Sequence, residues 1–284
     1  VITHLDLNVA VDMEAQRISG TARYRIKDHG KGRIVLDTDG LSVDAVTDAK
    51  GTPLEFALGD STFLGRPLEV KIPAGTEALS IQYHSGRNAK ALQWLEPQQT
   101  TDKKHPFLFT QGQAILTRSW IPIQDSPGIR FTYDATVKVP NDLMAVMSAT
   151  NPQQRTMDGT YTFHQEQPIP AYLIALAVGD LVFLPVDQRT GVYAERSVVE
   201  KAAWEFADMG TMLRTAEDLY GPYRWGRYDV IVLPPSFPFG GMENPMLTFA
   251  TPTIIAGDRS LTALIAHELA HSWSGNLVTN ATWD

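Results

Sequence analysis

Residues 261–273 read LTALIAHELAHSW, an apolar segment interrupted by two histidines and one glutamate. Its length and apolar content predict a helix, and Gly275 is a natural residue to end it. Residues four apart lie on the same face of a helix, so His267 and His271 are expected to converge. Glu268 directly follows the first histidine. The segment therefore predicts two imidazoles and a carboxylate gathered at one place.

The pattern His-Glu-x-x-His in this segment is typical of a metal site. Two convergent imidazoles can bind one Zn²⁺, with Glu268 beside them to take a proton from a metal-bound water. The alternative is a helix whose histidines only cap it or pair with neighbouring groups. That alternative leaves polar side chains on an otherwise apolar helix, where burial without a partner costs free energy. We therefore favour a metal, one zinc ion per site, with His267 and His271 as ligands.

The composition bounds the class of protein. A chain of 284 residues with 43% hydrophobic and 20% charged residues is typical of a soluble globular protein of about two domains. Its 24 basic and 32 acidic residues give a formal charge of −8, which argues against nucleic acids and anionic membranes as partners. We find no apolar run long enough to predict a membrane span. Because there are no cysteines, any metal must be held by His, Glu or Asp.

The first two thirds of the chain show the alternation of apolar and polar residues that half-buried β-strands have. Turn-forming Gly, Pro, Asn and Asp residues separate the alternating segments. Many short strands with regular turns predict large antiparallel sheets, and we expect a β-rich domain over residues 1–184. The clearest alternating segments are residues 5–11, 22–26, 79–83 and 131–139.

Residues 185–284 have a mixed pattern. Apolar residues recur at helical spacing from residue 198 to residue 220, and the Gly-Pro pair that follows would end this helix. A short apolar strand at residues 228–233 and the helix at residues 261–273 come next. This order predicts an α/β domain. No flexible linker precedes it, so it is expected to pack closely against the β-rich part.

A second candidate segment, residues 239–245, reads FGGMENP and precedes the histidines. Two adjacent glycines allow the backbone to approach other groups closely. One interpretation is a tight turn with a solvated Glu243. The other is a backbone rim along an extended ligand, with Glu243 aimed into a cleft. The segment alone leaves both open.

Together, Gly-Gly-Met-Glu-Asn and His-Glu-x-x-His at this spacing resemble the zinc metallo-aminopeptidases of the gluzincin type. Further segments are similar to the branch that contains leukotriene hydrolase/aminopeptidase, and the resemblance extends over essentially the whole chain. It implies a mixed fold: an N-terminal all-β, saddle-like domain of antiparallel sheets, then the first part of an α/β thermolysin-like catalytic domain. The further segments are PPSFPF at 234–239, GNLVTN at 275–280, TWD at 282–284, TQGQA at 110–114 and IQDSP at 123–127.

The resemblance also implies an activity, the removal of N-terminal residues from peptides. His267 and His271 would bind zinc, and Glu268 would be the general base that activates the zinc-bound water. Glu243 would bind the α-amino group of the substrate. A carboxylate facing an ammonium favours a peptide with a free N-terminus over an internal peptide segment.

The same resemblance implies further substrate-binding residues. Gln113 would reach from the β-rich domain to help hold the amine, with Gln111 close by. Strand alternation on a polar face explains both glutamines equally well from the residues alone. The residues implied to line the first side-chain pocket or to border the peptide are Phe239, Gly240, Gly241 and Met242.

The family pattern continues past Asp284. Its third zinc ligand, a Glu in an Asn-Glu-Gly segment, and its oxyanion-stabilising Tyr are expected there. The chain thus looks like an N-terminal portion, truncated within its catalytic domain, for which we expect a remaining C-terminal part as partner. Two histidines alone bind zinc weakly, so we expect this portion to be weakly active or inactive.

Two alternatives for the function and two for the location remain. The protein could combine aminopeptidase with epoxide hydrolase activity, as one member of the resembled branch does. It could instead be a non-catalytic β-rich binding or interaction module. The resemblance implies a cytoplasmic protein, and a periplasmic or secreted one if a leader has been removed.

Overall fold

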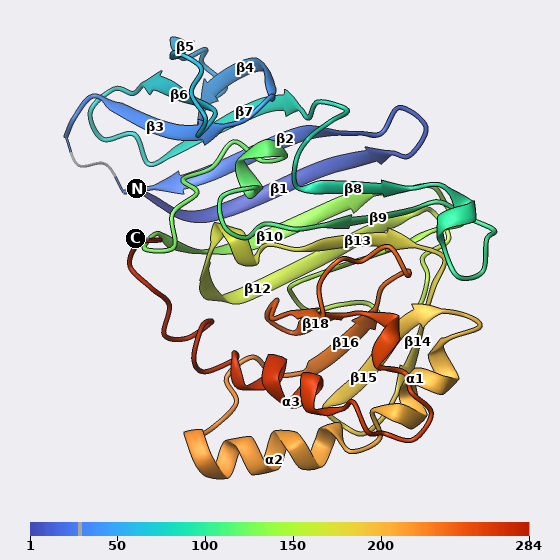
Figure 1. Cartoon of the computed structure of the whole chain (residues 1–284). Helices are drawn as coiled ribbons and strands as arrows, with labels where there is room; N and C mark the ends of the chain where they lie inside the picture. Colours follow the sequence, from blue (N-terminus) through green and yellow to red (C-terminus); the bar gives the residue numbers. More distant parts are fainter. Residues whose placement is uncertain (28–29, 284) are drawn as a thin grey trace.

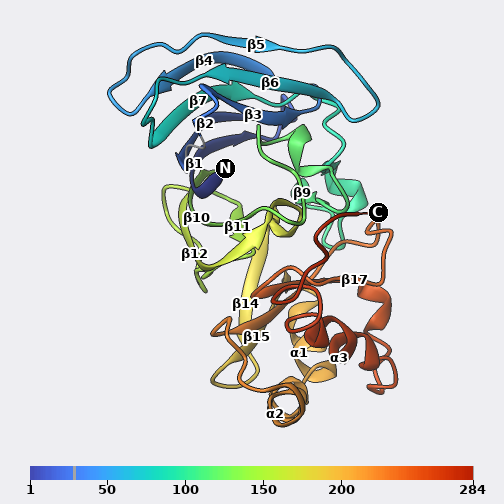
Figure 2. The ribbon, with the colours of Figure 1, turned by 90° about the vertical axis from the view of Figure 1, so that its left-hand side faces the viewer.

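The computed structural model describes residues 1–27 and 30–283, and Figure 1 shows it as a stack of sheets with helices at one end. Strands from the first half of the chain form the upper part of this view. The mixed sheet and helices α1, α2 and α3 form the lower part. Figure 2, turned by 90°, shows the same separation, so the molecule has a β-rich end and a mixed end, as predicted.

The largest sheet of the described residues has six strands in the order β12-β10-β1-β2-β7-β4. Neighbours pair antiparallel, except that β1 and β10 are parallel. Alternation in β1 buries Leu5, Leu7 and Val9 on the inner face and leaves polar residues on the outer face. The strands are β1 (Ile2–Asp12), β2 (Arg17–Ile26), β4 (Ser42–Asp48), β7 (Ala78–His84), β10 (Arg130–Lys138) and β12 (Thr160–Pro170).

Two smaller sheets complete the β-rich end. One has the order β3-β6-β5 and the other the order β11-β13-β9-β8. Every residue of β9, β11 and β13 is buried, so these strands form the core between the two ends of the molecule. The bounds are β3 (Arg33–Thr38), β5 (Phe56–Leu58), β6 (Arg66–Lys71), β8 (Leu92–Leu95), β9 (Phe107–Thr110), β11 (Met144–Met147) and β13 (Leu176–Gly179).

The mixed end is built on a five-stranded sheet in the order β14-β15-β16-β18-β17. The central pairs β15/β16 and β16/β18 are parallel, and both edge pairs are antiparallel. Strand β17 is therefore an edge strand. The bounds are β14 (Leu181–Pro185), β15 (Thr190–Glu195), β16 (Tyr228–Val232), β17 (Gly241–Met242) and β18 (Leu247–Ala250).

The helix predicted over residues 198–220 is divided in two, α1 (Val199–Glu205) and α2 (Met209–Tyr220). The division follows from a tertiary contact. The buried Glu205 carboxylate accepts hydrogen bonds from the backbone N–H of Gly257 at 2.8 Å and of Arg259 at 2.7 Å. Helical periodicity cannot reveal such a contact. The predicted end of α2 is observed, because Gly221 caps it with a φ of +91°.

The helix predicted over residues 261–273 is present but shorter, as α3 (Ala263–Ala270). It contacts α2, β17 and β18. The described part of the chain contains no helix that is both long and apolar enough to cross a membrane. Strand β14 spans the predicted domain division between residues 184 and 185, and that division stays a prediction.

Candidate metal and substrate site

Helix α3 is held in place by its apolar side. Ile265 and Leu269 are buried, and the Tyr228 hydroxyl of β16 donates a hydrogen bond to the Ile265 carbonyl at 3.2 Å. The helix is thereby fixed against the parallel part of the sheet. The polar residues His267 and Glu268, and His271 just after the helix, keep the orientation that this packing imposes.

The two histidines converge as their spacing predicts. Their Nε2 atoms are 3.2 Å apart, with the rings nearly perpendicular at 89°. The Nδ1 of His271 lies 2.9 Å from the Ser274 carbonyl, so this nitrogen carries the proton and donates it. The Nε2 of His271 then keeps its lone pair for a ligand, which is the usual arrangement of a metal-bound histidine.

Glu268 lies beside the histidines in a buried position, 5% exposed. A Cβ atom at Gly241 would stand only 2.3 Å from the Glu268 Oε1 atom. The carboxylate therefore needs a glycine at this point of β17. Burial and the nearby Glu243 carboxylate raise the pKa of Glu268 to about 7, and His271 lowers it by less.

Glu243 completes the cluster from the opposite side. One ligand atom each from Glu243, Glu268 and His271 lie within 4.8 Å of one another. The segment that carries Glu243 is fixed by Asn276, whose Nδ2 donates a hydrogen bond to the Glu243 carbonyl at 2.7 Å. Two carboxylates this close repel each other, so the position favours a cationic group between them.

Of the two predicted glutamines, one reaches this segment and the other does not. The Nε2 of Gln111 contacts the Met242 Sδ at 3.4 Å, which joins the β-rich end to the Gly-Gly-Met-Glu-Asn segment. Its Oε1 is buried without a hydrogen-bond partner. Gln113 is exposed, and within the described residues it makes no hydrogen bond to Glu243.

Phe239 and Gly240 directly precede β17 and are both exposed. The Phe239 ring is 52% exposed and packs edge-on against Phe237 at 5.8 Å. Phe237 is itself buried against Phe109 and Phe249. The exposed ring thus extends an aromatic cluster toward the surface, where an apolar side chain of a ligand can contact it.

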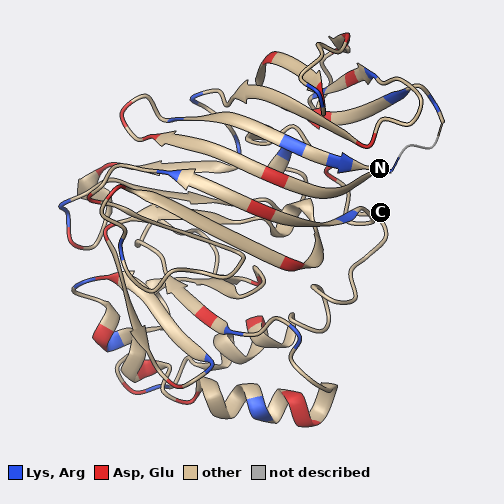
Figure 3. Ribbon diagram, turned by 180° about the vertical axis from the view of Figure 1, so that it is seen from behind, with Lys and Arg blue, Asp and Glu red and all other residues tan. Residues whose placement is uncertain are grey.

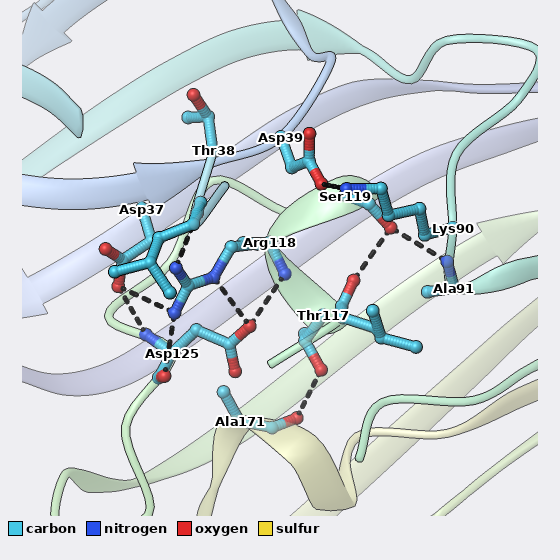
Figure 4. Close-up of polar contacts among 12 residues, drawn as sticks. Asp37, Thr38, Asp39, Lys90, Ala91, Thr117, Arg118, Ser119, Asp125 and Ala171 are labelled. Carbon is cyan, nitrogen blue, oxygen red and sulfur yellow. Dashed lines mark hydrogen bonds and ion pairs between the residues drawn. The ribbon is translucent and has the colours of Figure 1, made fainter. Parts of the chain in front are cut away.

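The loop that carries the glutamines is supported by a polar network that Figure 4 shows. The Thr117 hydroxyl, in η2 (Thr117–Ser119), donates to the Ala171 carbonyl at 3.0 Å. The Arg118 Nε donates to the buried Asp125 carboxylate at 3.2 Å. The Asp125 N–H donates to the Asp37 carboxylate of β3 at 2.9 Å. These bonds tie η2 and the loop before it to β3 on one side and to the turn after β12 on the other.

Asn276 and Arg118 support the site but were not predicted from the sequence. Asn276 belongs to the GNLVTN segment, and Asp125, the partner of Arg118, belongs to the IQDSP segment. A buried amide or a buried ion pair needs hydrogen-bond partners, and these partners hold the segment in place. These partners lie far away in the sequence, so only the folded structure reveals them.

Two family models match the chain. The one described as the Peptidase M1 N-terminal domain matches residues 1–173, and the one described as the Peptidase family M1 domain matches residues 204–284. Together they cover the β-rich end and most of the mixed end, including both candidate segments.

Curated relatives agree with these models. The chain is 45% identical to leukotriene A-4 hydrolase of Xenopus laevis over 296 residues, which cover all of the chain and 48% of the relative. It is 41% identical to leucine aminopeptidase 2 of Yarrowia lipolytica over 288 residues, 99% of the chain and 44% of the relative. The chain thus spans about half the length of the curated relatives it matches.

Solved structures show the same similarity in three dimensions. The structure of yeast LTA4 hydrolase in complex with bestatin matches with a TM-score of 0.93 at 39% identity. Native leukotriene A4 hydrolase from Saccharomyces cerevisiae matches with a TM-score of 0.92 at 40% identity. In both cases the match covers 100% of the chain and 45% of the solved one.

Proposed function

The chain belongs to peptidase family M1, and we propose that it carries the metal-binding and amine-binding residues of a zinc-dependent aminopeptidase. One observation supports this most: Glu243, Glu268 and His271 present ligand atoms within 4.8 Å of one another. The Nε2 atom of His267 lies 3.2 Å from that of His271. The cluster combines a metal-binding pair, a buried base and a second carboxylate. An enzyme that hydrolyses the peptide bond after an N-terminal residue with a charged amino group needs these groups.

The histidine pair fits zinc. Zn–N bonds of 2.0–2.1 Å in a tetrahedral site place two ligand nitrogens about 3.3 Å apart, and the two Nε2 atoms here are 3.2 Å apart. His267 and His271 would hold the ion. A third protein ligand from outside residues 1–284 would complete a catalytic site. When bound, zinc polarises the scissile carbonyl and lowers the pKa of a water molecule at the site.

Glu268 would act as the general base. Its raised pKa, about 7, suits a group that accepts a proton from the attacking water and passes it to the leaving amine near neutral pH. Gly241 leaves room for the carboxylate.

Glu243 would select substrates with a free N-terminus. Its carboxylate would pair with the α-ammonium group of the substrate, which an internal peptide segment lacks. Among the described residues, no strand pairs with the outer side of the edge strand β17, so an extended peptide could lie along it beside Glu243. Phe239 would contact the first side chain.

The test is Glu268→Gln in the full-length protein. We expect kcat for aminoacyl substrates to fall about 10²–10⁴-fold, the usual contribution of a general base. Zinc content should be unchanged, because the glutamine keeps the shape of the side chain. Near-normal turnover with zinc retained would contradict the role of Glu268.

A second candidate activity is epoxide hydrolysis in addition to peptidase activity. It is favoured by the 45% identity to a protein named leukotriene A-4 hydrolase. Turnover of a fatty-acid epoxide by the full-length protein would establish it. Absence of turnover on both substrate classes would favour a non-catalytic binding module instead.

A further inference from the structure

A second cluster of metal-ligating side chains lies on the outer face of the six-stranded sheet, the face seen in Figure 3. Asp6 of β1 lies directly opposite Asp134 of β10 in the strand register. Asp134 in turn lies opposite His164 of β12. His4 precedes Asp6 on the same face of β1. The register of three strands therefore gathers two carboxylates and two imidazoles.

The donor atoms of this cluster are close and oriented. The His4 Nε2 lies 3.2 Å from the Asp6 Oδ1 and 3.4 Å from the Asp134 Oδ2. On the other side of the ring, the His4 Nδ1 lies 2.7 Å from the Thr132 hydroxyl. The second oxygen of Asp134, Oδ1, lies 2.5 Å from the His164 Nδ1. His4 is buried, 9% exposed, so its ring is fixed between these partners.

Two carboxylates lie side by side in this arrangement, and within the described residues their ion-pair partners are the imidazoles of His4 and His164. Like charges directly opposite each other on neighbouring strands destabilise a sheet. Arg23 of β2 lies opposite Asp6 on its other side, yet in the described part of the chain it forms no ion pair with Asp6 or Asp134. A cation shared by the two carboxylates would remove the repulsion.

We propose that His4, Asp6 and Asp134 form a binding site for a divalent transition-metal ion of the Zn²⁺ type, separate from the His-Glu-x-x-His site. The distances of 3.2 and 3.4 Å between donor atoms match the roughly 3.3 Å edge of a tetrahedral zinc site. A nitrogen ligand favours such ions over Mg²⁺ or Ca²⁺. Thr132 and His164 orient the ligands, as second partners of metal ligands usually do.

The competing explanation is a protonated His4 that pairs with both carboxylates and leaves no place for a metal. The two explanations predict different responses to added Zn²⁺. A proton-bridged cluster without a metal site gains no stability from added Zn²⁺ at neutral pH, whereas a metal site is stabilised by an amount that rises with the logarithm of the free Zn²⁺ concentration above its Kd.

The test uses the chain with His267→Ala and His271→Ala, which removes the first candidate metal site. Equilibrium dialysis against Zn²⁺ alone should show one saturable ion per chain, and Zn²⁺ should raise the Tm. Adding Asp6→Asn or Asp134→Asn should weaken that binding at least tenfold and abolish the rise in Tm. The two carboxylates are 42% and 44% exposed, so both variants should fold, with a metal-free Tm no lower than that of the parent.

The matched control is Asp142→Asn. Asp142 forms a similar pair with His105, with an Oδ2–Nδ1 distance of 3.0 Å. The other carboxylate near His105, that of Asp180, is engaged by Arg155, so this pair should not bind zinc. The control should leave zinc binding unchanged. Absence of saturable Zn²⁺ binding in the parent variant, or equal binding after Asp6→Asn and Asp134→Asn, would overturn the proposal.

Discussion

Gly241 controls how closely β17 approaches Glu268. A methyl group at Gly241 would meet the Oε1 atom at 2.3 Å and the Cδ atom at 2.6 Å, far inside normal contact distance. The carboxylate of Glu268 would have to move. Because general-base catalysis depends on hydrogen-bond geometry, a small displacement is enough to slow the reaction.

We therefore predict that Gly241→Ala lowers kcat/KM of the full-length protein at least tenfold with zinc content unchanged. Gly240→Ala is the matched control. A methyl group there would approach only the Leu264 Cδ1, at 3.3 Å, the end of a flexible side chain. Equal losses in the two variants would show that Gly241 has no special relation to Glu268.

Single residues were also the part of the site that sequence could predict best. The spacing of His267 and His271 places their nitrogens together without any knowledge of the fold. Their roles as zinc ligands, and those of Glu268 and Glu243, stay predictions. The contact between Gly241 and Glu268 could not be predicted, because it joins residues from two elements whose packing is a tertiary property.

At the scale of elements, the segment after α3 holds the site together. Asn276 is 1% exposed and bonds the Glu243 carbonyl. Arg130, at the start of β10, donates to the Asn276 carbonyl at 2.5 Å and to the Thr279 hydroxyl at 2.6 Å. The segment thus connects α3, the Gly-Gly-Met-Glu-Asn segment and the six-stranded sheet.

Replacing Asn276 by Ala should cost about 1–3 kcal/mol of unfolding free energy, since it leaves the Glu243 carbonyl without its buried donor. Denaturant unfolding of the chain would measure the loss. Asn280→Ala, at an exposed position of the same segment, should change stability by less than about 0.5 kcal/mol. A loss for Asn276→Ala no larger than this control would contradict the anchoring role.

Elements were predictable where their own residues determine them. Alternation was enough to predict the β-rich end, and Gly221 was enough to predict the end of α2. The break between α1 and α2 could not be predicted, because Glu205 is drawn to the backbone of residues 257–259 by a contact absent from local periodicity. The parallel pairing of β1 with β10 is likewise invisible to alternation, which has the same period in both kinds of pairing.

At the scale of the whole molecule, residues from both the β-rich end and the mixed end contribute to the site. We propose that it also needs a zinc ligand from outside residues 1–284. Gln111 comes from the β-rich end, while Glu243 and the histidines come from the mixed end. The chain spans about half of its curated relatives. Sequence resemblance could predict that both parts of the chain contribute to the site, but not the polar contacts by which Arg118 and Asp125 join η2 to β3.

Because a third zinc ligand is proposed to lie outside residues 1–284, we predict that these residues alone bind zinc weakly at His267 and His271. The difference in bound zinc between the unchanged chain and His271→Ala measures the zinc held at this site alone. With two protein ligands instead of three, its Kd should be at least 100-fold higher than in the full-length protein. Competition with a chelator of known affinity would measure both values. Equally tight binding in the two proteins would show that no further ligand is needed.

The central claim is that Glu243 makes the site an aminopeptidase by binding the α-ammonium group. The most direct measurement compares kcat/KM for one peptide with a free and with an acetylated N-terminus, in the full-length protein and in Glu243→Gln. Loss of one partner from a desolvated charge pair costs about 2–5 kcal/mol. We predict that the variant loses at least roughly 30-fold on the free peptide and little on the acetylated one, so that the preference collapses. An unchanged preference in Glu243→Gln would contradict the account.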